Sequence, residues 1–111
     1  KNKKIKIFGK GEELRDHVWV EDVAKIIVQV LINRSEGILN IATGRVLSFE
    51  KIAKLIIKLT NSSSKIKNIK RKGPMPHNGY RSFNVTLLKR VFPNFKYQKM
   101  SDVLYKIKEL Y

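Results

Sequence analysis

The sequence predicts a small α/β domain with short strands and three to four helices. Two kinds of periodicity predict it. Apolar and basic residues alternate over positions 4–8, as in a strand, and apolar residues recur every three or four positions over 20–33 and 49–59, as in helices. Strands that alternate with helices favour the α/β class. A chain of 111 residues can bury one modest core, so we expect a single domain over residues 1–111.

The composition is strongly basic. The chain has 24 Lys and Arg against 9 Asp and Glu, a formal net charge of +15, which favours anionic partners. Lysine far outnumbers arginine, so we attribute this excess to compositional bias together with an anionic small ligand rather than to nucleic acid. The absence of cysteine excludes disulfides and thiolate metal sites and suits a cytoplasmic protein. Because lysines interrupt every apolar run, we expect no membrane association.

The first part of the chain should form a strand, a helix and a second strand. Ile5 and Ile7 should share one face of the first strand. The helix at 20–33 has only a narrow polar stripe, so we expect it to be buried on most sides. After a turn, the apolar residues at 38–41 predict a short strand.

The remainder should contain three helices, a strand and an irregular segment. Ser48 is a suitable N-cap for the helix at 49–59, because its hydroxyl can accept a hydrogen bond from a free amide of the first turn. The aromatic residues Phe92, Phe95 and Tyr97 are expected to pack the end of the domain. Further expected elements are a strand at 65–70, an irregular segment at 71–81, a short helix at 86–91 capped by Asn84, and a final helix at 101–110 capped by Ser101 or Asp102.

A Gly-x-Gly loop follows the first strand. Such a loop can open a dinucleotide-binding fold, in which the amides at a helix N-terminus hold a pyrophosphate. That pattern needs a third glycine where Leu14 stands, so the dinucleotide fingerprint fails. Carboxylates that would repel a pyrophosphate follow the loop: Glu12, Glu13 and Asp16.

The segment 9–24 instead resembles the "GxGxxxRDxxxVxD" segment of extended short-chain dehydrogenase/reductase proteins, the NAD-dependent sugar-nucleotide epimerases and dehydratases. Residues 40–44 resemble the "NIGsG"-like segment of that family, and residues 48–53 resemble its "xSxxExA" helix start. The resemblance implies that residues 1–111 are the carboxy-terminal substrate-binding lobe of a Rossmann-type enzyme, without its cofactor domain. The positions that match the first motif are Gly9, Gly11, Arg15, Asp16, Val20 and Asp22.

Arg15 is the strongest candidate for a substrate contact. The resemblance implies that it binds the diphosphate of a nucleotide sugar, to which a guanidinium can give two parallel hydrogen bonds. The alternative is a structural ion pair between Arg15 and either Asp16 or Asp22, which would hold the loop against the helix.

Two further arginines match family motifs less closely. Arg71 fits the arginine of an "RxGD"-like stretch that also holds the diphosphate, although Pro74 replaces the acid. Arg81 resembles the arginine of an "RxxxD" entry into the last helices, although Asn84 replaces the aspartate and the spacing is one residue shorter. Each of the two could equally be a solvated arginine. His77 lies in the same loop, where an exposed histidine is the simpler interpretation.

The catalytic and cofactor motifs of the family are missing from this chain. Its members use a Tyr-x-x-x-Lys pair, but Asn84, Ser101 and Glu109 stand four residues after the tyrosines that could begin one. Two histidines without cysteine make a weak case for a metal. We therefore expect neither catalysis nor a cofactor on this chain alone, and NAD or NADP in the intact parent enzyme.

The expected partners are a nucleotide-diphosphate sugar and the amino-terminal cofactor domain. An isolated lobe would expose the apolar surface that faces this domain, so self-association is also expected. The competing hypothesis is a small basic nucleic-acid-binding module, based on the net charge and on aromatic residues interleaved with lysines over 80–99. No nucleic-acid-binding signature supports that hypothesis.

Overall fold

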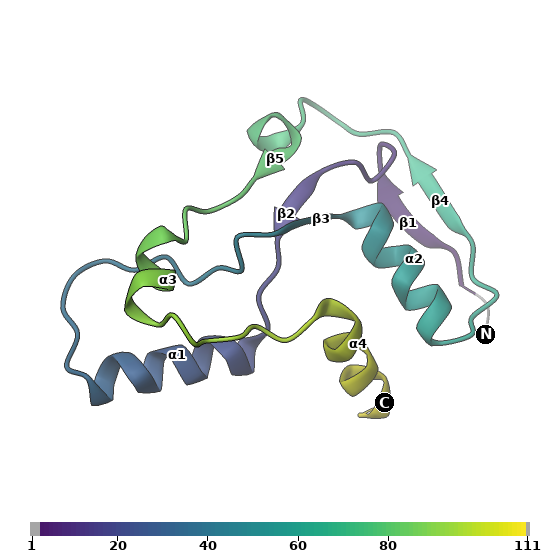
Figure 1. The fold of residues 1–111 in the computed structure, drawn as a ribbon. Helices are drawn as coiled ribbons and strands as arrows, with labels where there is room; N and C mark the ends of the chain where they lie inside the picture. The colour runs from purple at the N-terminus through teal and green to yellow at the C-terminus, as the bar shows by residue number, and fades with distance from the viewer. Residues whose placement is uncertain (1–2, 111) are drawn as a thin grey trace.

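The computed structural model describes residues 3–110, which form four α-helices and five short strands (Figure 1). The predicted α/β class is confirmed. No helix within these residues is long and apolar enough to cross a membrane. The elements in chain order are β1 (Ile5–Phe8), β2 (Leu14–Asp16), α1 (Val20–Ile32), β3 (Val46–Ser48), α2 (Phe49–Leu59), β4 (Ile66–Ile69), the 3-10 turn η1 (Pro76–Gly79), β5 (Tyr80–Arg81), α3 (Thr86–Val91) and α4 (Met100–Glu109).

The strands form two small sheets. Strand β1 pairs in parallel with β4, so that Ile5 lies opposite Ile66 and Phe8 opposite Ile69. In the second sheet β2 lies between β3 and β5, antiparallel to the former and parallel to the latter. This topology places residues 14–16 beside residues 80–81, which are far away in the sequence. The second sheet thereby joins the two regions that contain the candidate arginines.

The predicted strands at 4–8 and 65–70 are confirmed as β1 and β4. Strands β2, β3 and β5 were not predicted, because two or three residues are too few to show a periodicity. The predicted strand at 38–41 is wrong. This segment has no ladder partner within residues 3–110, and the side chain of Ile38 is 92% exposed.

Local sequence signals explain how the later helices begin. The Oγ of Ser48 accepts a hydrogen bond of 3.1 Å from the amide of Lys51, which confirms the predicted cap of α2. The Oδ1 of Asn84 accepts a 2.9 Å hydrogen bond from the amide of Thr86 at the start of α3. Helix α4 begins one residue earlier than predicted, so its N-cap is Lys99 rather than Ser101 or Asp102.

The small core lies between α1 and α3. Ile26 is fully buried and packs with Leu88 and Phe92. The rings of Phe95 and Tyr97 meet edge to face with centroids 5.0 Å apart, which confirms the predicted aromatic packing. The partly buried residues around this cluster are Val30, Leu39, Ile41, Phe95 and Tyr97.

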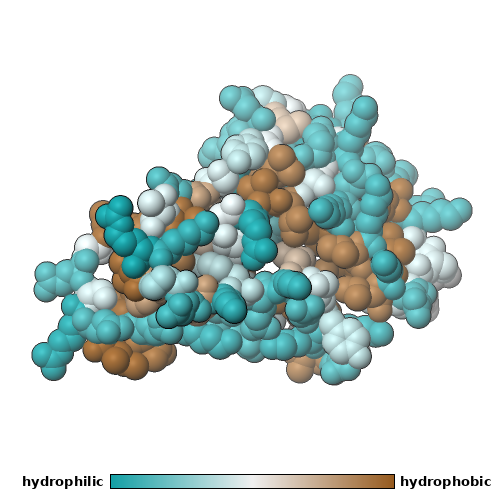
Figure 2. All heavy atoms as spheres, viewed as in Figure 1, coloured by the Kyte–Doolittle hydropathy of each residue, from teal (hydrophilic) through white to brown (hydrophobic). Residues whose placement is uncertain are grey.

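Helix α1 has the predicted extent, but the prediction that it is buried on most sides is wrong. Only Asp22 and Ile26 are buried, whereas Leu31 and Ile32 are 70% and 75% exposed. The described chain is a plate of 48 × 36 × 16 Å, so α1 is covered on one side only. Figure 2 shows apolar surface at the end of the plate where α1 and α3 lie, and again over the strands and α2.

Candidate functional site

One buried carboxylate joins two of the three candidate arginines. Glu13 is 7% exposed, and its Oε2 lies 2.6 Å from Nη2 of Arg15. Its other oxygen, Oε1, forms an ion pair with Nη2 of Arg71 at the end of β4. Both guanidiniums are largely buried, with side-chain exposures of 17% and 19%. Arg15 and Arg71, which are far apart in the sequence, therefore contact the same carboxylate.

Arg15 is also held by two backbone carbonyls. Its Nη1 donates to the oxygen of Leu14 at 3.1 Å, and its Nη2 donates to the oxygen of Pro76 at 3.2 Å. The second bond ties β2 to the turn that precedes β5. These contacts fix the guanidinium plane, and they use part of its donor capacity.

The predicted alternative partners of Arg15 are wrong. Successive side chains of a strand point to opposite faces, so Asp16 lies away from its neighbour Arg15. The Oδ2 of Asp22 instead accepts a 2.8 Å hydrogen bond from the amide of Gln98. Glu13 was not predicted as the partner, because sequence reasoning treated it only as a repulsive charge. Its spacing of two residues from Arg15 along an extended segment is the signal that could have identified it.

Arg81 lies next to Arg15 in the second sheet. The two residues are register partners in the parallel pairing of β2 with β5, so their side chains leave the same face of the sheet. Arg81 is exposed, and its guanidinium carbon lies 5.6 Å from the ring centre of Phe83. Its Nη1 is 3.5 Å from Nε2 of His77, which is itself exposed as the sequence predicted. The fold thus places Arg81 beside Arg15 in the second sheet, while Glu13 links Arg15 to Arg71.

The Gly-x-Gly loop between β1 and β2 does not fit a dinucleotide. The amide of Lys10 donates to Oε2 of Glu12 at 2.7 Å, and the amide of Gly11 donates to the oxygen of Phe8 at 3.0 Å. These amides are therefore unavailable to a pyrophosphate. The pKa of Glu12 is held below its usual value, first by a hydrogen bond from its own backbone amide. The carboxylate therefore stays charged in the loop.

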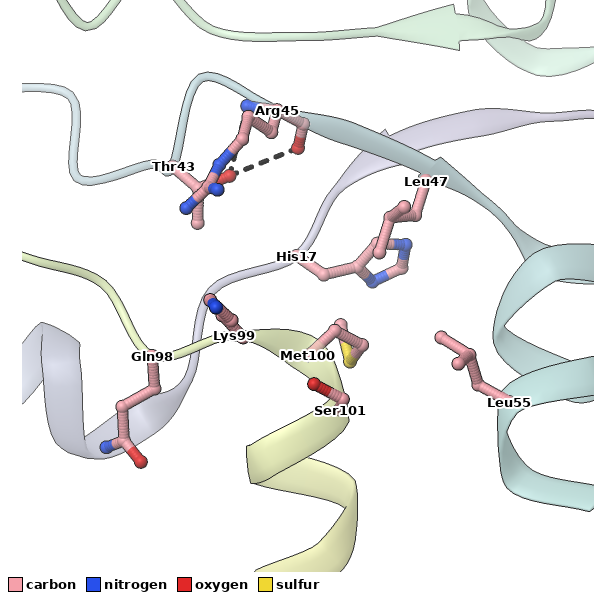
Figure 3. Close-up of a pocket in the computed structure, with 9 residues that line it drawn as sticks. All are labelled: His17, Thr43, Arg45, Leu47, Leu55, Gln98, Lys99, Met100 and Ser101. Atoms are coloured by element: carbon pink, nitrogen blue, oxygen red, sulfur yellow. Dashed lines mark hydrogen bonds between the residues drawn. The ribbon is translucent and has the colours of Figure 1, made fainter. Parts of the chain in front are cut away.

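Asp16 shapes a second loop, between residues 42 and 46. Its Oδ1 accepts hydrogen bonds from the amide and the hydroxyl of Thr43, at 3.0 and 2.8 Å. Its Oδ2 accepts a bond of 2.7 Å from the amide of Gly44. The loop borders a pocket of 290 Å³ between β2, β3, α2 and the start of α4 (Figure 3). None of the three candidate arginines lines this pocket. Across residues 3–110, no three His, Asp or Glu side chains gather as ligands for a metal ion.

The same fold occurs in solved structures of longer enzymes. The chain has the small α/β fold found in Rossmann-type extended short-chain dehydrogenase/reductase enzymes. A dTDP-glucose 4,6-dehydratase from Bacillus anthracis, solved with NAD, matches with a TM-score of 0.78 and 22% identity over 94% of this chain and 33% of its own. A UDP-N-acetylglucosamine 4-epimerase from Methanobrevibacter ruminantium, solved with UDP-N-acetylmuramic acid, matches with a TM-score of 0.74 and 19% identity over 96% of this chain and 35% of its own.

A third structure is a UDP-glucose 4-epimerase from Thermotoga maritima with UDP-glucose, with a TM-score of 0.68 and 22% identity over 97% of this chain and 36% of its own. The chain thus spans about a third of the length of the structures it matches. The sequence model of the NAD dependent epimerase/dehydratase family matches residues 1–42. The resemblance to the sugar-nucleotide epimerases and dehydratases is therefore confirmed.

Proposed function

We propose that residues 1–111 form the carboxy-terminal substrate-binding lobe of an NAD(P)-dependent nucleotide-sugar epimerase or dehydratase. In this proposal Arg15, Arg71 and Arg81 bind the diphosphate of the nucleotide sugar. The observation that carries it is the convergence of these arginines: two of them contact the same carboxylate, and the third is the register partner of Arg15.

The chemistry of this cluster suits a diphosphate. Glu13 binds both Arg15 and Arg71, the charged Glu12 also acts on Arg71, and Arg81 on the neighbouring strand adds an exposed cation. Glu13 holds Arg15 and Arg71 in place before a ligand arrives, which reduces the entropy lost on binding. Fixed, charged donors also orient the sugar, and orientation is the contribution of such a lobe to catalysis.

The hydride chemistry belongs elsewhere in the parent enzyme. NAD or NADP, bound by the amino-terminal cofactor domain, would accept and return a hydride. The acid/base pair would lie in that domain too, because Tyr80, Tyr97 and Tyr105 have no lysine four residues later. We expect the intact enzyme to act in the cytoplasm.

The shape of the chain supports a partner domain. Its accessible surface of 8774 Å² exceeds the roughly 6,300 Å² expected for a self-contained protein of 12.9 kDa. Its radius of gyration is 16.7 Å, against about 13 Å for a compact domain of this length. The outer apolar face of α1, with Val20, Leu31 and Ile32, is the surface that we assign to the cofactor domain. Without this domain the same face would drive self-association.

Titration calorimetry with UDP tests the proposed site. Wild-type chain should bind UDP, and Arg71→Ala should weaken binding by about ten- to a hundredfold, because a charge-assisted contact to phosphate is lost. Arg90→Ala is the matched control, since Arg90 is an exposed arginine on α3 that contacts neither Glu13 nor β2 in the described chain. NAD should not bind to this chain. Equal UDP affinity in both variants would contradict the diphosphate assignment.

A further inference from the structure

Two adjoining pockets open beside the start of α4, away from the arginine cluster. The first is the 290 Å³ pocket of Figure 3, into which His17 projects from the end of β2. The second has a volume of 440 Å³ and lies against α3. Thr43, Arg45 and Lys99 line both pockets, so the two share one wall. Neither Arg15, Arg71 nor Arg81 lines either pocket.

The shared wall carries uncompensated positive charge. Arg45 and Lys99 are exposed, and neither forms an ion pair with a carboxylate of residues 3–110. No Asp or Glu is among the residues that line the two pockets. The nearby carboxylate of Asp16 is already satisfied by three hydrogen bonds from Thr43 and Gly44. Two further cations, Lys89 and Lys96, line the second pocket.

Each pocket is also lined by a residue with a buried polar atom that has no hydrogen bond within residues 3–110. In the part of the chain that the structure describes, three buried side-chain atoms lack a hydrogen bond, and two of them are Nε2 of His17 and the hydroxyl oxygen of Tyr97. His17 lines the first pocket and Tyr97 the second. Burial, and then the charges of Asp16 and Asp22, raise the pKa of Tyr97, while a weaker backbone interaction with Ala42 lowers it. Buried polar groups normally have partners, so these two atoms leave hydrogen-bonding capacity beside the pockets that a ligand could use.

The second pocket has an apolar floor, and the first pocket lies at the start of a helix. Leu88 and Phe92, which are 3% and 8% exposed, form part of the floor of the second pocket. Helix α4 has ten residues, its N-cap Lys99 gives no side-chain cap, and Met100 and Ser101 of its first turn line the first pocket. The positive end of the helix dipole therefore lies beside this pocket.

We propose that the two pockets bind an organic phosphate, with the phosphate between Arg45 and Lys99 and an apolar or aromatic group against Leu88 and Phe92. This site is separate from the diphosphate cluster proposed above. Its occupant would be a second ligand of the protein, recognised by charge on one wall and by apolar contact on the other.

Phenyl phosphate is a direct probe of this site. We would titrate it into the isotope-labelled chain and follow amide and imidazole resonances, with inorganic phosphate as the comparison ligand. Phenyl phosphate should bind more tightly than inorganic phosphate and should shift the His17 imidazole resonances. Arg45→Ala and Lys99→Ala should each weaken its binding by about tenfold or more, as expected for a lost charge-assisted contact. Both residues are exposed, so neither change should affect folding.

Two control variants separate this site from other sources of binding. Lys67→Ala removes an exposed lysine of β4, and Arg15→Ala removes a member of the diphosphate cluster. Lys67→Ala should leave the affinity for phenyl phosphate unchanged, and Arg15→Ala should leave the shift of the His17 imidazole resonances unchanged. Equal weakening in all four variants would show diffuse attraction by a chain of charge +15, and would overturn the proposal. Weakening in Arg15→Ala alone would place the ligand at the diphosphate cluster, which would overturn this inference and leave the proposed function standing.

Discussion

Oε2 of Glu13 lies 2.6 Å from Nη2 of Arg15, two residues further along the same extended segment. The contact is largely buried, and the other oxygen of Glu13 binds Arg71. The segment 13–15 therefore contains both the arginine that we propose binds the substrate and the carboxylate that fixes the position of this arginine. Because a single carboxylate serves two guanidiniums, the stability of this region and its capacity to bind an anion depend on the same residue.

Glu13→Gln should destabilise the chain strongly. The amide keeps the shape of the side chain but leaves two largely buried guanidiniums without a counter-charge, and breaking a buried pair in this way costs about 3–5 kcal/mol. Glu50→Gln is the matched control, since Glu50 contacts Lys54 at the same distance of 2.6 Å while its side chain is 44% exposed. The control should lose no more than about 1 kcal/mol. Urea denaturation measures both changes, and similar losses would contradict the importance of the buried pair.

Gly11→Ala should be more harmful than Gly73→Ala. Both glycines have a positive φ, of 72° and 88°, so alanine is strained by about 1 kcal/mol or more at either position. A Cβ at Gly11 would also lie 2.6 Å from Cδ1 of Ile7 and 2.9 Å from the amide nitrogen of Glu50, whereas Gly73 has open space. Thermal melting should therefore show the larger decrease for Gly11→Ala. Equal decreases in melting temperature would mean that backbone strain alone, and not the packing of the loop against α2, requires a glycine at position 11.

Asp16→Asn should loosen the loop at residues 42–46. The carboxylate accepts three hydrogen bonds there, and hydrogen bonds to charged groups contribute about 1.5–3 kcal/mol each. Hydrogen exchange should accelerate at the amides of Thr43 and Gly44. Asp102→Asn, which changes an exposed aspartate of α4, should leave these two amides as protected as in the wild type. Unchanged protection in Asp16→Asn would refute its role in this loop.

The sequence predicted those parts of the fold in which neighbouring residues decide the structure. Helices α1 and α2 have strong periodicity, and Ser48 caps α2 as predicted. Segment 38–41 was predicted as a strand but has no partner strand within residues 3–110, and a strand depends on its partner. The burial of α1 was overestimated for a related reason: periodicity identifies an apolar face but does not show that the chain covers it.

The candidate site was predicted only in part, for the same physical reason. Motif resemblance selected Arg15, Arg71 and Arg81. The second sheet pairs Arg15 with Arg81, and Glu13 links Arg15 to Arg71. Glu13 was missed as their common partner, because a contact between distant residues is decided by tertiary packing. The wall formed by Arg45 and Lys99 has no motif either, and it becomes visible only once β3 and α4 are placed.

The exposed apolar face of α1 should make the chain self-associate. Light scattering at increasing concentration should show species larger than a monomer, because exposed apolar patches promote association. Leu31→Ser should reduce this association more than Leu110→Ser, although the two leucines are 70% and 74% exposed, because only Leu31 belongs to the patch on α1. If the chain stayed monomeric at every concentration, or if the two changes reduced association equally, the assignment of α1 as a docking face would be contradicted.

The most direct test of the account measures UDP-glucose affinity and thermal stability in Arg15→Ala and Arg15→Lys, beside the wild type. If Arg15 contacts the diphosphate, alanine should weaken binding by about ten- to a hundredfold, and lysine should restore only part of it because the planar fork is lost. Stability should fall modestly in both, since Glu13 keeps its ion pair with Arg71. Unchanged affinity in both variants, beside a clear drop in melting temperature, would contradict the account and leave Arg15 as a purely structural partner of Glu13.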